Sequence, residues 1–202
     1  MKAIWILSLL SAAALGDSLP DTLWTVYENN PYLELAADGV LTQDGCYAYA
    51  GTSDSLISLR VFSSAGDEML SRLYEIPYMN IVYGCSIDQL SDGGFLIGGM
   101  SADKCGVFLR TDAAADTLWT AVYPDVYMYS DIKVLAVSDG GYILMYETPG
   151  PYQYADTHIQ KFDSGDNLQW QIVLDSYYEN RMSWIGEDAD GSLMVAGKGF
   201  VP

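Results

Sequence analysis

The feature of this sequence that most constrains its fold is a fourfold internal repeat. In each unit an acidic residue precedes a tryptophan or leucine, here called the anchor, and an Asp-Gly pair follows about twenty residues later. The anchors are Trp24, Leu70, Trp119 and Trp170, and the Asp-Gly pairs begin at Asp44, Asp92, Asp139 and Asp190. Successive anchors are 46, 49 and 51 residues apart. A period of this length is typical of a repeat architecture.

The first three units each contain four short segments rich in β-branched and aromatic residues, separated by Gly, Asp, Ser or Pro, and the fourth unit contains the first three of them. In the third unit they are 118–123 (the anchor segment), 134–137, 142–146 and 157–162. No segment shows a sustained helical period with capping residues. Asp-Gly between two extended runs predicts a hairpin, because Gly adopts positive φ at little cost and Asp tolerates it. Four antiparallel strands in about 48 residues, repeated, predict the blade of an all-β β-propeller.

Two stretches of the third and fourth units carry a resemblance to known proteins. Residues 139–144 read Asp-Gly-Gly-Tyr-Ile-Leu, and residues 158–170 read His-Ile-Gln-Lys-Phe-Asp-Ser-Gly-Asp-Asn-Leu-Gln-Trp. They resemble the repeats of secreted bacterial β-propeller proteins, and they are similar to the PQQ-like, or quinoprotein-like, propeller superfamily. The resemblance covers essentially residues 21–197. Leu70 and Ser63 depart from it, since later units have Trp and Asp there. Its motifs concern blade packing, so it implies a fold and no quinone cofactor.

The repeat also predicts how the domain is divided. The units run over about 21–66, 67–115, 116–165 and 166–202, and the fourth stops after its third strand at Gly197. We therefore expect a partial propeller, an open arc with three complete blades and a fourth that lacks its last strand. Missing C-terminal blades or another chain would complete the ring.

The first sixteen residues have the pattern of a secretory signal peptide. Lys2 is followed by a mostly apolar stretch to Leu15, and Ala14-Leu15-Gly16 supplies small residues for cleavage. A membrane anchor would need roughly 20 apolar residues. The prediction is a signal peptide over 1–16, cleaved near Gly16, and a secreted protein in the extracellular space or periplasm.

Charge and cysteine content exclude some classes of partner. With 9 Lys and Arg against 27 Asp and Glu, the net charge is -18. Such a chain is not expected to bind nucleic acid or an anionic lipid surface. Cys46, Cys85 and Cys105 are an odd number, so at least one thiol stays unpaired. A Cys85–Cys105 disulfide and three small buried thiols both remain open.

The predicted meander separates two ends of the strands. The Asp-Gly turns share one end, the acidic end, with the turns around Asp67, Asp112, Asp116, Asp163 and Asp166. The loops after the anchor segments lie at the other, the tyrosine end, where Tyr32, Tyr78 and Tyr127 each follow their anchor by eight residues and Tyr177 by seven. These four tyrosines are the candidates for a ligand-binding face, since such rings suit sugar stacking or protein contacts. The preferred alternative is that they pack the loops, because residues that recur in a repeat usually have structural roles.

The acidic end offers only a weak candidate for Ca²⁺. Asp188-Ala189-Asp190-Gly191 lacks the spacing and the closing Glu of an EF-hand, so solvated carboxylates are the preferred interpretation and no metal site is predicted.

No catalytic pattern is present in the sequence. His158 is the only histidine, and there is no Gly-x-Ser-x-Gly, His-Glu-x-x-His or P-loop motif. We therefore expect a non-catalytic exported scaffold that binds a protein partner or a surface glycan. The alternatives are a fragment of a propeller enzyme, such as a polysaccharide hydrolase or lyase, and a purely structural arc.

Overall fold

The computed structural model describes residues 6–10, 22–27, 34–126, 132–150, 155–174 and 180–199. All regular secondary structure in these ranges is β-strand, so they contain no helix that could cross a membrane. Sheet I consists of β3 (Glu34–Leu41), β4 (Tyr47–Ser53), β5 (Leu56–Phe62) and β6 (Glu68–Tyr74). Sheet II consists of β7 (Ile81–Gln89), β8 (Phe95–Ser101), β9 (Gly106–Thr111) and β10 (Thr117–Tyr123). Sheet III consists of β11 (Lys133–Ala136), β12 (Tyr142–Pro149), β13 (Ala155–Phe162) and β14 (Leu168–Leu174).

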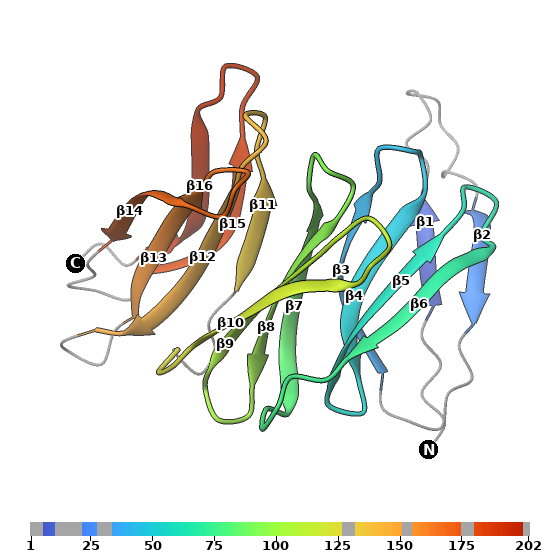
Figure 1. Ribbon diagram of the computed structural model, residues 1–202, viewed down its shortest axis with the longest axis horizontal. Helices are drawn as coiled ribbons and strands as arrows, with labels where there is room; N and C mark the ends of the chain where they lie inside the picture. The colour runs from blue at the N-terminus through green and yellow to red at the C-terminus, as the bar shows by residue number, and fades with distance from the viewer. Residues whose placement is uncertain are drawn as a thin grey trace.

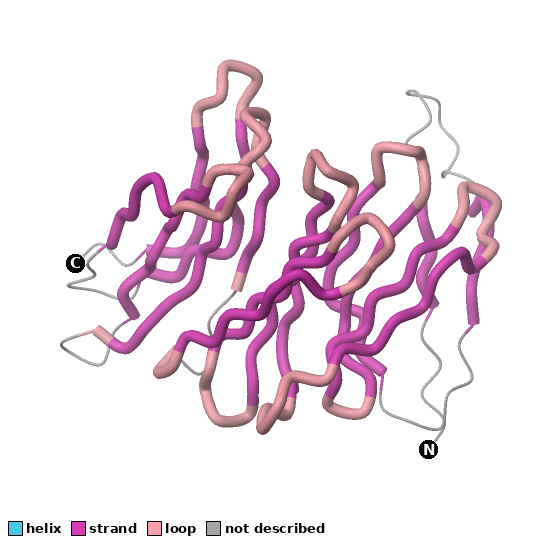
Figure 2. Tube along the Cα trace, viewed as in Figure 1, coloured by secondary structure: helices cyan, strands magenta, loops and turns pink. Residues whose placement is uncertain are grey.

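Two further pairs of strands flank these sheets. Sheet IV contains β15 (Asn180–Glu187) and β16 (Leu193–Gly199), and β1 (Ile6–Leu10) pairs with β2 (Thr22–Tyr27). Every pairing is antiparallel and joins strands that are consecutive in sequence. The sheets stand side by side along the molecule (Figure 1), and turns gather at both ends of the strands (Figure 2). The predicted all-β arc of propeller-like blades is confirmed.

The sheets are one strand out of phase with the units read from the sequence. The anchor segments form β6, β10 and β14, and each is the last strand of the preceding sheet. A tight turn such as Asp112–Asp116 joins each to the strand before it, whereas a longer loop such as 75–80 leads to the next sheet. A repeat has no intrinsic starting point, so the tight hairpin connections set where a sheet begins.

The strand β1 lies inside the predicted signal peptide. Ile6 is the partner of Tyr27, and a register break follows Ser8, near the β1–β2 connection. The pairs β5–β6, β9–β10 and β13–β14 have a break at the corresponding place. The β1–β2 pair therefore has the form of the last two strands of a sheet. Cleavage of residues 1–16 stays a prediction.

Three apolar layers hold neighbouring sheets together, face to face. One lies between sheets I and II, one between sheets II and III, and one between sheets III and IV. The anchors contribute as expected, since Leu70 packs into the first layer and Trp119 into the second, where its ring centroid is 6.3 Å from that of Tyr142. Burying an indole between sheets removes a large apolar area from water.

Carboxylates link the first strands of adjacent sheets, β3, β7 and β11. Asp38 on β3 accepts hydrogen bonds from the Ser86 hydroxyl (3.1 Å) and the Ile87 N–H (3.3 Å) on β7. Asp88 in turn accepts from the Ala136 N–H on β11 (2.8 Å). First strands have one edge without a partner strand, so these acids satisfy backbone donors that would otherwise be left unpaired. Nothing in the repeat pattern distinguishes these acids from solvated ones.

Candidate functional site

The Asp-Gly turns and the loops that follow the anchor strands lie at opposite ends of the strands. Along the upper edge in Figure 1 lie the turns β3–β4, β7–β8, β11–β12 and β15–β16, which contain the Asp-Gly pairs. Along the lower edge lie the β4–β5 and β8–β9 hairpins and the β6–β7 loop. The acidic end and the tyrosine end are therefore separated by the full length of the strands.

At the acidic end, the Asp-Gly pairs form four turns of one kind. Gly45, Gly93, Gly140 and Gly191 have φ between 81° and 86°. The preceding aspartate accepts a hydrogen bond from the N–H two residues later, at 2.9 Å for Gly94 and 2.8 Å for Gly141. Such local bonds explain why this dipeptide recurs. In each of these two turns, one carboxylate oxygen of the aspartate is occupied by a backbone N–H.

Two of these aspartates also bind a cation from the third strand of their sheet. Arg110 on β9 lies 2.7 Å from Asp92, and Lys161 on β13 lies 2.8 Å from Asp139. Arg110 reaches the next sheet as well, where it pairs with Asp166 in the β13–β14 turn. Asp166 also accepts a hydrogen bond from the Tyr142 hydroxyl at 2.9 Å. Arg110, at 7 % exposed, therefore links sheets II and III.

Arg60 does not take the equivalent position in sheet I, although the sequence groups it with Arg110 and Lys161. Arg110 is opposite the anchor Trp119, whereas the residue opposite the anchor Leu70 is Val61. Arg60 is one residue out of step, and its guanidinium instead lies 3.0 Å from Glu68. Arg60 therefore lies on the opposite face of its strand from the one that Arg110 occupies on β9.

The paired aspartates are stabilised in their charged form. Burial by itself raises the pKa of Asp92, but hydrogen bonds from Arg110 and the Gly94 N–H, with the Arg110 charge, bring that pKa below its usual value. The hydrogen bond from Lys161 lowers the pKa of Asp139, helped by the Gly141 N–H. Across the described ranges, no three His, Cys, Asp or Glu side chains are placed to hold a metal ion together. The acidic end thus uses its carboxylates in turns and ion pairs.

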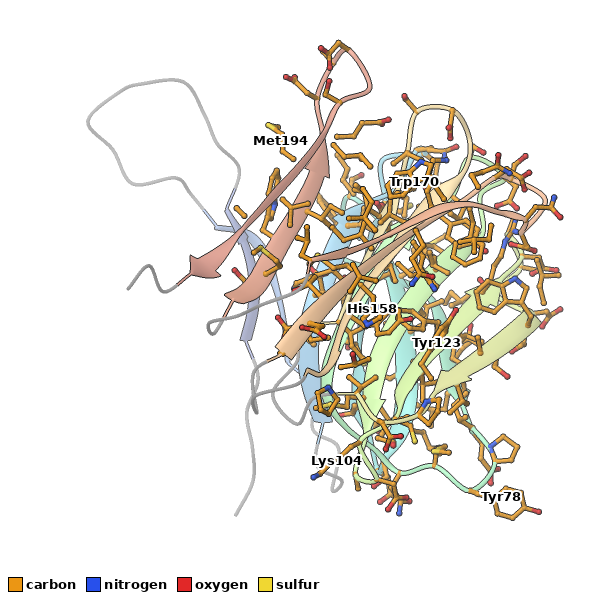
Figure 3. The ribbon with its side chains drawn as sticks, turned by 90° about the vertical axis from the view of Figure 1, so that its left-hand side faces the viewer. Tyr78, Lys104, Tyr123, His158, Trp170 and Met194 are labelled. Atoms are coloured by element: carbon orange, nitrogen blue, oxygen red, sulfur yellow. The ribbon has the colours of Figure 1, made fainter. Side chains whose placement is uncertain are left out.

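At the tyrosine end, Tyr78 stands out for its exposure and its backbone. The side chain is 99 % exposed, and Figure 3 shows it pointing away from the body of the protein. The Met79 N–H donates to the Ile76 carbonyl at 3.0 Å, so residues 76–79 form a β-turn with Pro77 second and Tyr78 third. Tyr78 has φ 64°, the left-handed conformation that the third position of a type II turn requires. Gly or Asn usually occupies this position, and a bulky residue there is strained.

A chain of backbone hydrogen bonds fixes the loops at this end. The Ile81 N–H donates to the Ser55 carbonyl at 2.9 Å. The Ala102 N–H donates to Asn80 at 2.9 Å, and the Val126 N–H to Lys104 at 2.8 Å. Each loop is therefore tied to a neighbouring connection, which places Tyr78 on a supported platform.

The other three tyrosines of the predicted face, Tyr32, Tyr127 and Tyr177, lie outside the described residues. Whether they gather near Tyr78 stays a prediction. Lys104 and Asp103 in the β8–β9 hairpin are exposed at the same end of the strands. Neither residue was singled out by the repeat, because the hairpin that carries them differs from unit to unit in length and composition.

A hollow of about 250 Å³ between sheets II and III was not predicted. It is lined mainly by Trp119, Tyr123, Tyr142 and Phe162. The rings of Tyr142 and Phe162 stack at 5.1 Å, and the buried Trp119 Nε1 has no hydrogen-bond partner. These are the residues that join the two sheets, so the hollow belongs to their packing.

His158 and Cys85 are held in place by packing and hydrogen bonds within the fold. The His158 ring stacks on Tyr146 at 5.0 Å, and its Nε2 lies 2.9 Å from the Thr148 hydroxyl. Burial lowers the pKa of His158. Cys85 is buried and burial raises its pKa to about 12, while all three cysteines are free thiols. The possible Cys85–Cys105 disulfide is not formed.

Comparisons with known proteins support the fold and no more. No protein-family model and no curated protein matches the chain. A crystal structure at 1.35 Å of a protein of unknown function from Bacteroides caccae is similar, with TM-score 0.52 and 10 % identity over 88 % of this chain and 57 % of that one. NanB, solved with Optactamide, has TM-score 0.60 and 12 % identity over 85 % of this chain and 30 % of NanB. This chain thus spans less than two thirds of either structure.

Proposed function

We propose that this protein is a non-catalytic, exported β-propeller repeat scaffold that binds a protein partner or a surface glycan at its tyrosine end. The observation that supports it is Tyr78, a fully exposed aromatic residue in a strained backbone conformation. An exposed ring gains nothing from packing, and glycine would form the same turn without strain. A binding role would explain why a tyrosine is there.

The surroundings of Tyr78 suit a binding residue. Tyrosine presents a flat ring with a polar tip and loses few rotamers on binding, so it is favoured at contact surfaces. Its loop is tied to the β8–β9 hairpin through Asn80, which reduces the ordering cost on binding. The acidic end, by contrast, has its aspartates engaged in turns and ion pairs.

A binding assay with tyrosine-end variants tests the proposal. The full chain would be applied to a glycan array and to surface proteins of the source cell, and the affinity of each ligand found would be measured. Tyr78→Ala together with Tyr127→Ala is expected to weaken that affinity at least about tenfold, because aromatic contact residues often contribute 2 kcal/mol or more. Leu118→Ala is the matched control, since Leu118 is 54 % exposed on β10, away from these loops.

Tyr78→Gly adds a stability readout. It should abolish the Tyr78 contribution to binding yet raise the free energy of unfolding by about 1 kcal/mol, because the left-handed strain is removed. Full affinity in the double variant would refute the aromatic-face proposal. Release of sugar fragments from any glycan would show an enzyme instead.

A further inference from the structure

The packing of sheets II and III leaves a hollow that is lined by aromatic rings and one carboxylate. Its volume is about 250 Å³. An apolar cavity of about 150 Å³ is enough to hold benzene. The rings of Trp119, Tyr123 and Phe162, all half-buried, contribute to the wall, and the exposed Asp166 lines it as well. The hollow is therefore reached from solvent and has room for a small ligand.

The side-chain donors around the hollow are either used or out of reach. The Tyr142 hydroxyl donates to Asp166 at 2.9 Å, and the Tyr123 hydroxyl donates to a side-chain oxygen on β13 at 3.2 Å. The Trp119 Nε1 is buried. Thr120 follows Trp119 with no register break between them, so its side chain is on the opposite face of β10. An anion or a sugar would therefore find few side-chain donors here.

Asp166 gives the hollow an acceptor and an excess of negative charge. Its Oδ1 accepts from Tyr142 and pairs with Arg110, and no partner for its Oδ2 occurs in the part of the chain that the structure describes. Arg110 is shared with Asp92, so one cation stands between two carboxylates. This cluster has one more negative charge than positive charge. The charge next to the rings therefore favours a cation.

The junction between sheets I and II lacks both the indole and the carboxylate. Leu70 takes the anchor position of Trp119 there and packs in the apolar layer. Ala115 takes the turn position of Asp166, and it is 1 % exposed. Two sheets of this protein thus pack without these groups. The rings and the carboxylate of the hollow are a property of one junction, and the repeat itself does not require them.

We propose that the hollow between sheets II and III binds a small organic ammonium ion, a quaternary or methylated amine. The rings of Trp119, Tyr123 and Phe162 contact its methyl groups, and the Asp166 Oδ2 balances its charge. Aromatic rings attract such cations through their quadrupole. The net charge of -18 raises the concentration of cations near the protein. This site is separate from Tyr78 and does not rest on the function proposed for the tyrosine end.

Choline is a direct probe, and 3,3-dimethylbutan-1-ol is an uncharged molecule of the same shape. Each would be titrated into the full chain by isothermal titration calorimetry at fixed ionic strength. Saturable one-to-one binding of choline is expected, with a Kd of about 0.1 to 10 mM. The alcohol should bind at least about fivefold more weakly, because it lacks the charge that the rings and Asp166 attract.

Two variants remove the contacts one at a time. Trp119→Leu should weaken choline binding at least about fivefold, and leucine already serves as the anchor of sheet I at Leu70. This change keeps the net charge, so it separates ring contact from general attraction of cations. Asp166→Asn should weaken binding about three- to tenfold, because it removes the facing charge. Asparagine also tolerates the left-handed conformation of Asp166, whose φ is 64°.

Matched controls change the same residue types outside the hollow. Trp170→Leu replaces the anchor of sheet III, and Asp139→Asn removes a carboxylate that pairs with Lys161. Neither residue lines the hollow. Both variants should leave the affinity for choline within about twofold of the wild type.

Phosphatidylcholine vesicles distinguish a lipid head group from a free amine as the source of the ammonium. The protein would be sedimented with the vesicles, with and without choline. Sedimentation that both choline and Trp119→Leu reduce assigns the head group, and no sedimentation alongside saturable choline binding assigns a free amine.

Three outcomes would overturn the proposal. The first is no saturable binding of choline, and the second is equal affinity for the uncharged alcohol. The third is choline binding that Trp119→Leu leaves unchanged, since the ion would then be held by net charge alone. Urea unfolding of each variant confirms that it is folded, and Phe162→Leu provides a second ring variant should Trp119→Leu be unfolded. None of these results depends on ligand binding at Tyr78.

Discussion

At the scale of residues, Arg110 and Arg60 show how a one-residue offset changes the contacts of a basic residue that recurs in the repeat. Arg110 faces the next sheet and binds Asp92 and Asp166, with the Tyr142 ring 5.9 Å from its guanidinium carbon. Arg60 lies on the other face of its strand, since neighbouring residues alternate, and pairs with Glu68 on the next strand of its own sheet. The side chain of Arg110 is 9 % exposed and that of Arg60 17 %.

Breaking the ion pairs of the two arginines should therefore have different effects on stability. Arg110→Met is expected to lower the free energy of unfolding by about 2 kcal/mol, because two carboxylates and a buried tyrosine lose their shared partner. Glu68→Gln, which removes the exposed partner of Arg60, should cost less than about 1 kcal/mol, because Glu68 is 44 % exposed. Urea denaturation of both variants measures the difference. Equal effects would contradict the role of Arg110 as a link between sheets.

In one turn, residue type alone would assign the left-handed conformation to the wrong position. Gly66, Ala115 and Asp166 occupy the same position in the β5–β6, β9–β10 and β13–β14 turns, with φ 91°, 63° and 64°. The sequence has a glycine at 165, one residue before the position that needs positive φ. Asp tolerates this conformation, and its carboxylate there reaches Arg110 of the preceding sheet. The contact between sheets explains an aspartate where glycine would be easier.

At the scale of elements, the anchor strands β6, β10 and β14 have one sequence role and two environments. Leu70 and Trp119 pack against the next sheet, whereas Trp170 is 36 % exposed. The repeat predicts the same contact for all three, because the pattern is the same. What differs is the neighbour: sheets II and III have a third strand to cover the anchor of the sheet before, and sheet IV has none among the described residues.

This contrast can be measured with one substitution at two places. Trp119→Ala should lower the free energy of unfolding by about 3 kcal/mol, since it leaves a void between sheets II and III. Trp170→Ala should cost less than about 1.5 kcal/mol, because part of the ring is already in water. Thermal and urea unfolding give both values. A cost at Trp170 as large as that at Trp119 would mean that something covers Trp170 in solution.

At the scale of the whole molecule, acidic residues act in two opposing ways. The net charge of -18 disfavours a compact state through repulsion. Individual acids nevertheless stabilise the fold, since Asp38 joins β3 to β7 and Asp92 and Asp139 hold turns and cations. The balance between these effects depends on pH.

The pH dependence follows from the direction of the pKa shifts. The pKa values of Asp92 and Asp139 are lowered in the folded protein, so their contribution is present above the unfolded value of about 3.9 and is lost as pH falls through the folded pKa. Each contributes less than about 1 kcal/mol, because both carboxylates are well exposed. Burial raises the pKa of Asp88, so Asp88 acts in the opposite direction, and its cost disappears as it is protonated.

We expect urea midpoints to change little between pH 7 and 5 and to fall below about pH 4. Asp139→Asn should show a smaller fall than the wild type, because the titrating pair is already gone. A stability that rises steadily down to pH 3 would show that relief of charge repulsion outweighs the ion pairs. Raising the salt concentration at pH 7 isolates the repulsion, since screening removes it.

The sequence by itself determined the fold class, the order of the strands in each repeat, and the placement of the Asp-Gly turns at the end of the strands opposite to the β6–β7 loop that carries Tyr78. These follow from local rules: alternating apolar residues give strands, Asp-Gly gives tight turns, and an antiparallel meander sends alternate turns to opposite ends. The packing of Trp119 between two sheets could also be predicted, because tryptophan recurs at the anchor position of the repeat.

Only the tertiary structure decided which strands share a sheet, that Val61 rather than Arg60 corresponds to Arg110, and which anchor lies in water. It also located the carboxylates that link the first strands of adjacent sheets, and it showed that Tyr78 is exposed and has a strained backbone. Each of these depends on contacts between residues in different sheets, often about fifty positions apart, as for Asp38 with Ser86. A repeat reports the period of such contacts, but the partner of each residue is set by how the sheets pack.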